Sequence, residues 1–205
     1  GVVRVEERIN SAELYSKTGL QFQSFNTLYQ LAVDQSEQRP LLAHAEKALL
    51  IPDLFNFWLS GVQAAERTNA STTGLLNPFT QDWDRELVAR IGLQKRLLPK
   101  IVDEGTDLGA ITAEVQKLTG LSAQTRVVTV GSHDTASAFV AVPSTKANSL
   151  FLSSGTWSLL GVELETPILS DAARAANFTN EGGVDGRIRF LKNVTGLWLV
   201  QEACR

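Results

Sequence analysis

The stretch Val130-Gly131-Ser132-His133-Asp134-Thr135 decides the fold class, because it joins a strand-like run to a helix-like one. Valine and threonine dominate residues 126–130, a short β-branched run that is typical of a buried strand. The small residues of 134–142 favour a helix, and Gly131 permits a tight turn between the two. Ligands of α/β folds gather at the carboxyl ends of strands. The sequence therefore predicts an α/β protein with a ligand site at this turn.

Asp134 is the candidate for chemistry at the turn. A carboxylate at a helix N-terminus is stabilised as the anion, so it can accept a proton from a bound hydroxyl group. An alternative is that Asp134 only caps the helix. His133 beside it can hydrogen-bond a ligand or simply pack. The local sequence leaves these alternatives open.

Two later segments carry further polar candidates. Residues 149–153 and 157–163 are predicted strands, and the hydroxyl-rich turn around Thr156 between them can present N–H and hydroxyl groups to a phosphate. An ordinary hairpin turn is the alternative. Asn193 follows the predicted strand 187–191 and can bind a polyol, and Gln201 lies on a closing helix where it could meet a nucleotide.

The first half of the chain is predicted to be helical, with a loop at 104–110. Ser11 is expected to cap a helix that Gly19 ends, and Pro52 to start another. Further helices are expected from Asn26 and over 84–91 and 111–118. The polar, turn-forming segment 143–148 predicts a boundary between one domain at 1–143 and a second at 148–205.

Composition excludes several classes of protein. The chain has 205 residues, and a net charge of -3 with scattered Lys and Arg argues against nucleic-acid binding. Cys204 is the single cysteine and there are two histidines, so neither an intrachain disulfide nor a structural metal site is expected. No apolar run approaches the ~20 residues of a membrane span, and the N-terminus is unlike a signal peptide, so we expect a cytoplasmic protein without membrane contact.

Taken together, the segments resemble the FGGY carbohydrate kinases, and within that family most closely the members that act on L-rhamnulose. The resemblance runs in order along the chain, on the segments Phe25–Leu31, Leu50–Asp53, Thr68–Thr73, Trp83–Asp84, Ser132–Ala138, Leu152–Leu159, Thr179–Gly183, Leu191–Asn193 and Gly196–Leu199. It implies an actin-like ATPase (RNase H-like) fold, with the back half of the first lobe and the opening strands of the second.

The resemblance also implies a role for each candidate residue. Asp134 would be the base that accepts the proton of a sugar hydroxyl, and His133, Asp134, Thr135 and Asn193 would contact the sugar. Thr156 and Gln201 would contact ATP, and Mg²⁺ would bridge its phosphates, in a reaction that depends on positioning and charge neutralisation.

The implied reaction is the ATP-dependent phosphorylation of L-rhamnulose to L-rhamnulose 1-phosphate. Alternatives are another FGGY kinase that acts on fuculose or xylulose, and a non-catalytic sugar-binding protein on the same fold. The family's first phosphate turn and its adenine contacts are expected to lie outside these residues, so residues 1–205 are predicted to be an inactive central fragment. The sequence does not set the oligomeric state.

Overall fold

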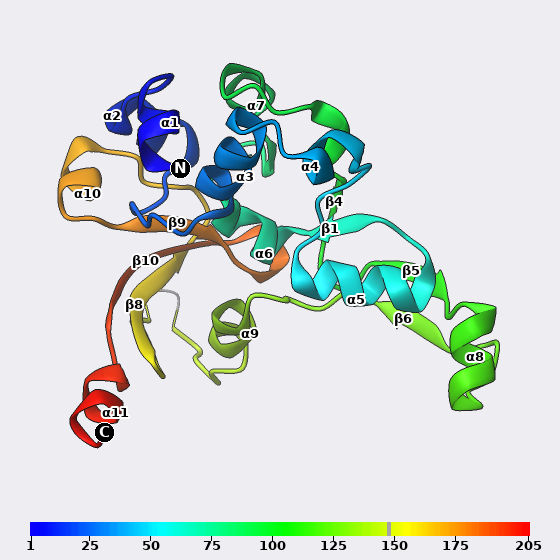
Figure 1. Ribbon diagram of the computed structural model, residues 1–205. Coiled ribbons are helices and arrows are strands. Elements are labelled where there is room, and N and C mark those ends of the chain that lie inside the picture. The colour runs from blue at the N-terminus through cyan, green and yellow to red at the C-terminus, as the bar shows by residue number, and fades with distance from the viewer. Residues whose placement is uncertain (147–148) are drawn as a thin grey trace.

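The computed structural model describes residues 1–146 and 149–205, and it is a mixed α/β chain, as predicted (Figure 1). Helices and two-stranded pairs form the part up to residue 146, and a four-stranded antiparallel sheet dominates the part from residue 149. The predicted boundary at 143–148 includes residues 147 and 148, which lie outside the described residues, so the division into 1–143 and 148–205 stays a prediction.

Nine α-helices occur within residues 1–146, and two residues show how the sequence sets where a helix begins or ends. Gly19 ends the second helix in a left-handed conformation (φ 66°), as expected. Its cap, however, is Asn10, whose Oδ1 accepts the N–H of Glu13 at 2.9 Å, so the prediction that Ser11 caps it is wrong. Pro52 lies in the first turn of its helix, which confirms that prediction. The helices are α1 (Val2–Glu6), α2 (Ser11–Thr18), α3 (Thr27–Ser36), α4 (Pro40–His44), α5 (Ile51–Ser60), α6 (Arg67–Ala70), α7 (Arg85–Arg90), α8 (Ala113–Thr119) and α9 (Asp134–Val140).

The part up to residue 146 also contains three pairs of strands, and of these strands the sequence predicted only the one that begins at Arg126. They are β1 (Ala64–Glu66) with β4 (Lys100–Val102), in parallel, and two antiparallel pairs, β2 (Leu76–Asn77) with β3 (Asp82–Trp83) and β5 (Asp107–Ala110) with β6 (Arg126–Val128). The loop predicted at 104–110 is therefore partly strand β5, which its pairing with β6 stabilises. The predicted buried strand exists as β6, but Val127 alone of its three residues is buried, because a two-stranded pair covers only one face.

The sheet of the second part has the strand order β7-β8-β10-β9. Its strands are β7 (Phe151–Ser154), β8 (Trp157–Leu164), β9 (Thr179–Gly182) and β10 (Ile188–Thr195), and the same part contains the helices α10 (Asp171–Ala175) and α11 (Trp198–Ala203). This confirms the three predicted strands and the closing helix, and adds β9. Helix α9 packs on β7, where the rings of Phe139 and Phe151 stack with centroids 4.7 Å apart. Figure 1 shows the termini on different sides of the molecule, with α11 far from the β5–β6 pair.

Gly161 on β8 is a position where the sheet tolerates only glycine. It lies opposite Leu191 of β10, and a Cβ atom there would overlap the Leu191 side chain and lie 2.5 Å from the Phe190 carbonyl oxygen. We expect Gly161→Ala to lower the free energy of unfolding by about 1–3 kcal/mol, because overpacking forces the two strands apart. Urea unfolding followed by circular dichroism measures the change.

Gly155→Ala is the matched control for that substitution. A Cβ atom at Gly155 would meet its nearest neighbour, the Trp157 carbonyl oxygen, at an ordinary 3.8 Å. Its effect should therefore stay within about 0.5 kcal/mol. Equal losses in the two variants would contradict the close approach at Gly161.

Candidate functional site

Asp134 is the first residue of α9, and its side chain is 97% exposed. Its Oδ1 accepts the N–H of Thr135 at 2.6 Å and the hydroxyl of Thr135 at 3.1 Å. A capping side chain instead precedes the first helical residue and binds an N–H two or three residues on. His133 occupies that cap position and makes no side-chain capping bond. The geometry thus favours a solvent-facing carboxylate over a helix cap.

Two adjoining cavities surround this turn. One, of about 350 Å³, contains Asp134, Thr135 and Thr156 in its wall. The other, of about 270 Å³, is lined by Gln21, Thr72 and Glu181 among others. Both cavities share the same four lining residues, which are Gln23, Phe25, His133 and Asn193. The first cavity therefore brings together five of the six predicted site residues.

Gln201 is the sixth predicted residue, and it lines neither cavity. It lies on α11 with an exposed side chain, and its backbone N–H donates to the Leu197 carbonyl oxygen as part of that helix. Its contact with ATP stays a prediction.

The β7–β8 turn that carries Thr156 is fixed by the entry to α11. The carbonyl oxygens of Gly155 and Thr156 accept the N–H groups of Leu197 (2.8 Å) and Gly196 (3.1 Å). A Cβ atom at Gly196 would lie 2.5 Å from the Gly155 oxygen, so this approach requires glycine. The turn is held through its backbone, and the Thr156 side chain is left exposed in the cavity wall.

His133 sits between two carboxylates. Its Nδ1 is 3.5 Å from Asp134 Oδ1, and its Nε2 is 3.7 Å from Glu181 Oε2. Burial lowers the pKa of His133, and the nearby charge of Arg189 lowers it further. At neutral pH the imidazole is therefore uncharged, so it can both donate and accept a hydrogen bond toward a polyol.

Glu181 and Arg189 form a buried ion pair behind the second cavity. They are directly opposite each other on β9 and β10, with Arg189 Nη2 3.2 Å from Glu181 Oε2. Arg189 is fully buried, and its Nε donates to the Gly182 carbonyl oxygen at 2.9 Å. The sequence analysis placed Glu181 in the resembling segment Thr179–Gly183 and Arg189 in the predicted strand 187–191, and it assigned a role to neither residue. An arginine between Ile188 and Phe190 was the available signal, because a charge inside an apolar strand needs a buried partner.

Gln21 is a second residue that sequence reasoning missed. Its Oε1 accepts the backbone N–H of Asn193 at 3.2 Å and the side-chain Nδ2 of Asn193 at 3.1 Å. The segment between α2 and α3 thereby orients the Asn193 amide at the cavity wall. No local pattern marks a lone glutamine for this role, because the contact joins distant parts of the chain.

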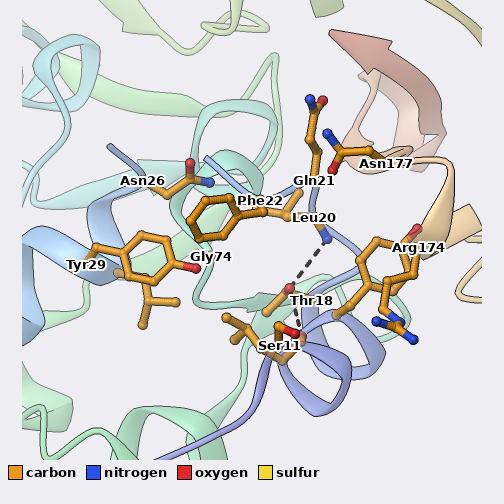
Figure 2. Close-up of a pocket in the computed structure, with 13 residues that line it drawn as sticks. Ser11, Thr18, Leu20, Gln21, Phe22, Asn26, Tyr29, Gly74, Arg174 and Asn177 are labelled. Atoms are coloured by element: carbon orange, nitrogen blue, oxygen red, sulfur yellow. Dashed lines mark hydrogen bonds between the residues drawn. The ribbon is translucent and has the colours of Figure 1, made fainter. Parts of the chain in front are cut away.

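The segment around Gln21 also lines a further cavity, of about 200 Å³, which Figure 2 shows. Leu20, Gln21 and Asn26 line both this cavity and the second one. Figure 2 shows the rings of Phe22 and Tyr29 on one side of this further cavity and Arg174 with Asn177 on the other. It contains none of the predicted site residues.

The described residues lack two features, a cluster of metal-ligating side chains and a membrane-spanning helix. Within 1–146 and 149–205, no group of three or more His, Cys, Asp or Glu side chains is placed to hold a metal ion. In the same residues, no helix is long and apolar enough to cross a membrane.

This chain belongs to the FGGY family of carbohydrate kinases. It matches the N-terminal domain of that family over residues 2–141 and the C-terminal domain over residues 150–205. Among curated proteins it is similar to the rhamnulokinases of Bacteroides thetaiotaomicron (46% identical over 97% of this chain) and Bacillus subtilis (43% identical over 97% of this chain). The chain spans 40% of the length of each.

Solved structures confirm the actin-like ATPase fold of this family. Ligand-bound xylulose kinase from Lactobacillus acidophilus superposes with a TM-score of 0.86 at 22% identity, over 100% of this chain and 41% of that one. Plasmodium falciparum glycerol kinase with ADP gives a TM-score of 0.74 at 16% identity, over 100% of this chain and 42% of that one.

Proposed function

We propose that this chain supplies the sugar-facing wall and part of the phosphate-facing wall of an enzyme that transfers the γ-phosphoryl group of ATP to L-rhamnulose. The observation that carries the proposal is the exposed Asp134 carboxylate, which shares one cavity with Asn193 and with the Thr156 turn. Phosphoryl transfer from ATP to an alcohol needs this arrangement, namely a base, a bound alcohol and a phosphate-binding turn in one cavity.

In the proposed reaction Asp134 accepts the proton of the sugar 1-hydroxyl. The hydroxyl oxygen forms a bond to the γ-phosphorus, the bond from that phosphorus to the β,γ-bridging oxygen breaks, and ADP leaves with the electron pair. His133, Thr135 and Asn193 hydrogen-bond the sugar hydroxyls, and Thr156 in the same cavity wall supplies a hydroxyl group to ATP. When bound with ATP, Mg²⁺ would supply charge neutralisation during the transfer.

The side chains that line the first cavity favour a deoxy sugar as the substrate. Phe25 and Trp157 form an aromatic wall, with ring centroids 6.5 Å apart, in a cavity that is otherwise rich in polar groups. L-Rhamnulose is a 6-deoxyketose, so it offers one methyl group to such a wall and hydroxyl groups to the rest. L-Fuculose has the same methyl group, whereas D-xylulose has none. The similarity to rhamnulokinases then favours rhamnulose over fuculose.

We expect the intact enzyme to phosphorylate L-rhamnulose in preference to L-fuculose and D-xylulose. A coupled assay of ADP release across the three sugars measures kcat/KM for each. One misplaced hydroxyl or methyl group in a fitted pocket typically changes kcat/KM by ~10–200-fold. A clear preference for xylulose would remove the rhamnulose assignment.

A non-catalytic sugar-binding protein is the competing class. Isothermal titration separates the two, because a binding protein takes up sugar with no dependence on nucleotide, whereas a kinase also binds ATP. A cytoplasmic location, where ATP is available, is part of the proposal.

A further inference from the structure

Glu66 is a fully buried carboxylate that joins the end of β1 to the loop before Asp134. Its Oε2 accepts the backbone N–H of Ser132 at 3.0 Å and the hydroxyl of Ser132 at 2.7 Å. The same oxygen accepts the hydroxyl of Thr68 at 2.6 Å, and Thr68 Oγ1 in turn accepts the N–H of His133 at 3.2 Å. The two residues that precede Asp134 are thus both tied to Glu66, one directly and one through Thr68.

Capping of α6 explains only part of this arrangement. Glu66 is the N-cap of that helix, and its carboxylate accepts the N–H groups of Thr68 (2.9 Å) and Asn69 (3.2 Å). A cap needs one or two such bonds. The bonds to Ser132 reach across 66 residues of sequence and add nothing to the helix.

The loop is held from its other side as well. The hydroxyl of Ser137, on α9, donates to the Gly131 carbonyl oxygen. Asp53 in turn holds the backbone of Glu66, because the N–H of Glu66 donates to Asp53 Oδ1 at 2.9 Å. Loop 131–133 is therefore hydrogen-bonded both to the end of β1 and to α9. Asp134 follows this loop directly and lies in the cavity wall.

We propose that Glu66 is a positioning residue, which holds loop 131–133 so that the Asp134 carboxylate meets the sugar hydroxyl. The role of Asp134 as base is taken from the proposed function, on which this inference rests. The hydrogen bonds that hold the loop do not depend on that role. Every group that hydrogen-bonds the Glu66 carboxylate is an N–H or O–H donor, so an amide in its place would set its own N–H groups against one of these donors.

Glu66→Gln tests the positioning role of Glu66 at unchanged side-chain size. We expect kcat of the intact enzyme to fall by ~10–100-fold, because a displacement of about 1 Å near the reacting atoms costs that much. The sugar KM should change less than kcat. Hydrogen–deuterium exchange of segment 131–135 should become faster, since the Ser132 N–H loses its carboxylate acceptor.

Asp84→Asn is the matched control. Asp84 is a buried acid that caps α7 by accepting the N–H of Leu87 at 2.8 Å, and it lines neither of the two adjoining cavities. This second acid-to-amide change should leave both kcat and the exchange of segment 131–135 as in the wild type. If Glu66→Gln keeps kcat within twofold of the wild type, or loses it without faster exchange in that segment, Glu66 does not position the loop.

Ser132→Ala covers the case in which Glu66→Gln does not fold. It removes one of the two bonds from Ser132 and should reduce kcat by a smaller factor, with faster exchange in 131–135. Where both variants fold, their combined effect should be less than the product of the single effects, because they break one shared interaction. A wild type that phosphorylates no sugar would defeat the proposed function, whereas the exchange comparison would still decide whether Glu66 holds the loop.

Discussion

In the intact enzyme, replacing Asp134 with asparagine is expected to reduce turnover by about 10²–10⁴-fold while sugar binding stays largely intact. Asparagine keeps the size of the side chain and can still accept the Thr135 N–H through its Oδ1, so the start of α9 should not change. The amide cannot take up a proton, and general-base catalysis typically contributes this factor. Turnover at saturating sugar and ATP, together with calorimetric titration of the sugar, measures the two effects separately.

Thr156→Val is the companion variant for Asp134→Asn. It removes an exposed hydroxyl from the same cavity at similar size, so it should weaken the use of ATP and leave sugar affinity unchanged. Were Asp134 only a helix cap, its asparagine variant would turn over normally, because asparagine caps about as well as aspartate. Normal turnover of Asp134→Asn at saturation would therefore remove the central claim about this site.

Asp53 is expected to make the protein less stable as pH rises from about 4 to about 6. Burial, with a smaller contribution from the neighbouring charge of Glu66, raises the pKa of Asp53 from its ordinary value of 3.8 to about 6. Over this interval the unfolded chain releases the proton and the folded chain keeps it, so the free energy of unfolding falls with pH. The difference between the two pKa values corresponds to about 3 kcal/mol, all of it lost above pH 6.

Asp53→Asn should abolish this loss. The amide keeps an oxygen that can accept the Glu66 N–H and has no proton to release in this range. Relative to the wild type, the variant should therefore gain up to about 3 kcal/mol between pH 4 and pH 7. Urea unfolding at both pH values gives the difference for each protein, and parallel pH profiles would show that Asp53 is not the group responsible.

Local signals predicted the parts of the fold that local chemistry decides. Gly19 ends a helix and Pro52 starts one, because each acts through its own backbone. The strand β5 could not be predicted in the same way. It has four residues, includes Gly109 at φ 105°, and exists only because β6 pairs with it across a shifted register.

The residues of the candidate site also differ in whether a local sequence pattern marks them. His133, Asp134 and Thr135 stand in one short motif, and the structure places all three in the cavity wall. Glu66 and Gln21 have no comparable motif, because their partners lie in other parts of the chain. Pairing between distant residues is a property of the folded state, so a single sequence does not display it.

The bond between Gln21 and Asn193 also bears on how the molecule refolds, since it closes a loop of 172 residues. Closing a long loop costs entropy before any contact repays it, so contacts of large sequence separation slow folding. Helices such as α3 and α5 depend on neighbours along the chain and can form early. After dilution of the intact enzyme from denaturant, the helical signal should therefore return before the cavity at Asp134 can bind sugar, and recovery of binding should report the slow step.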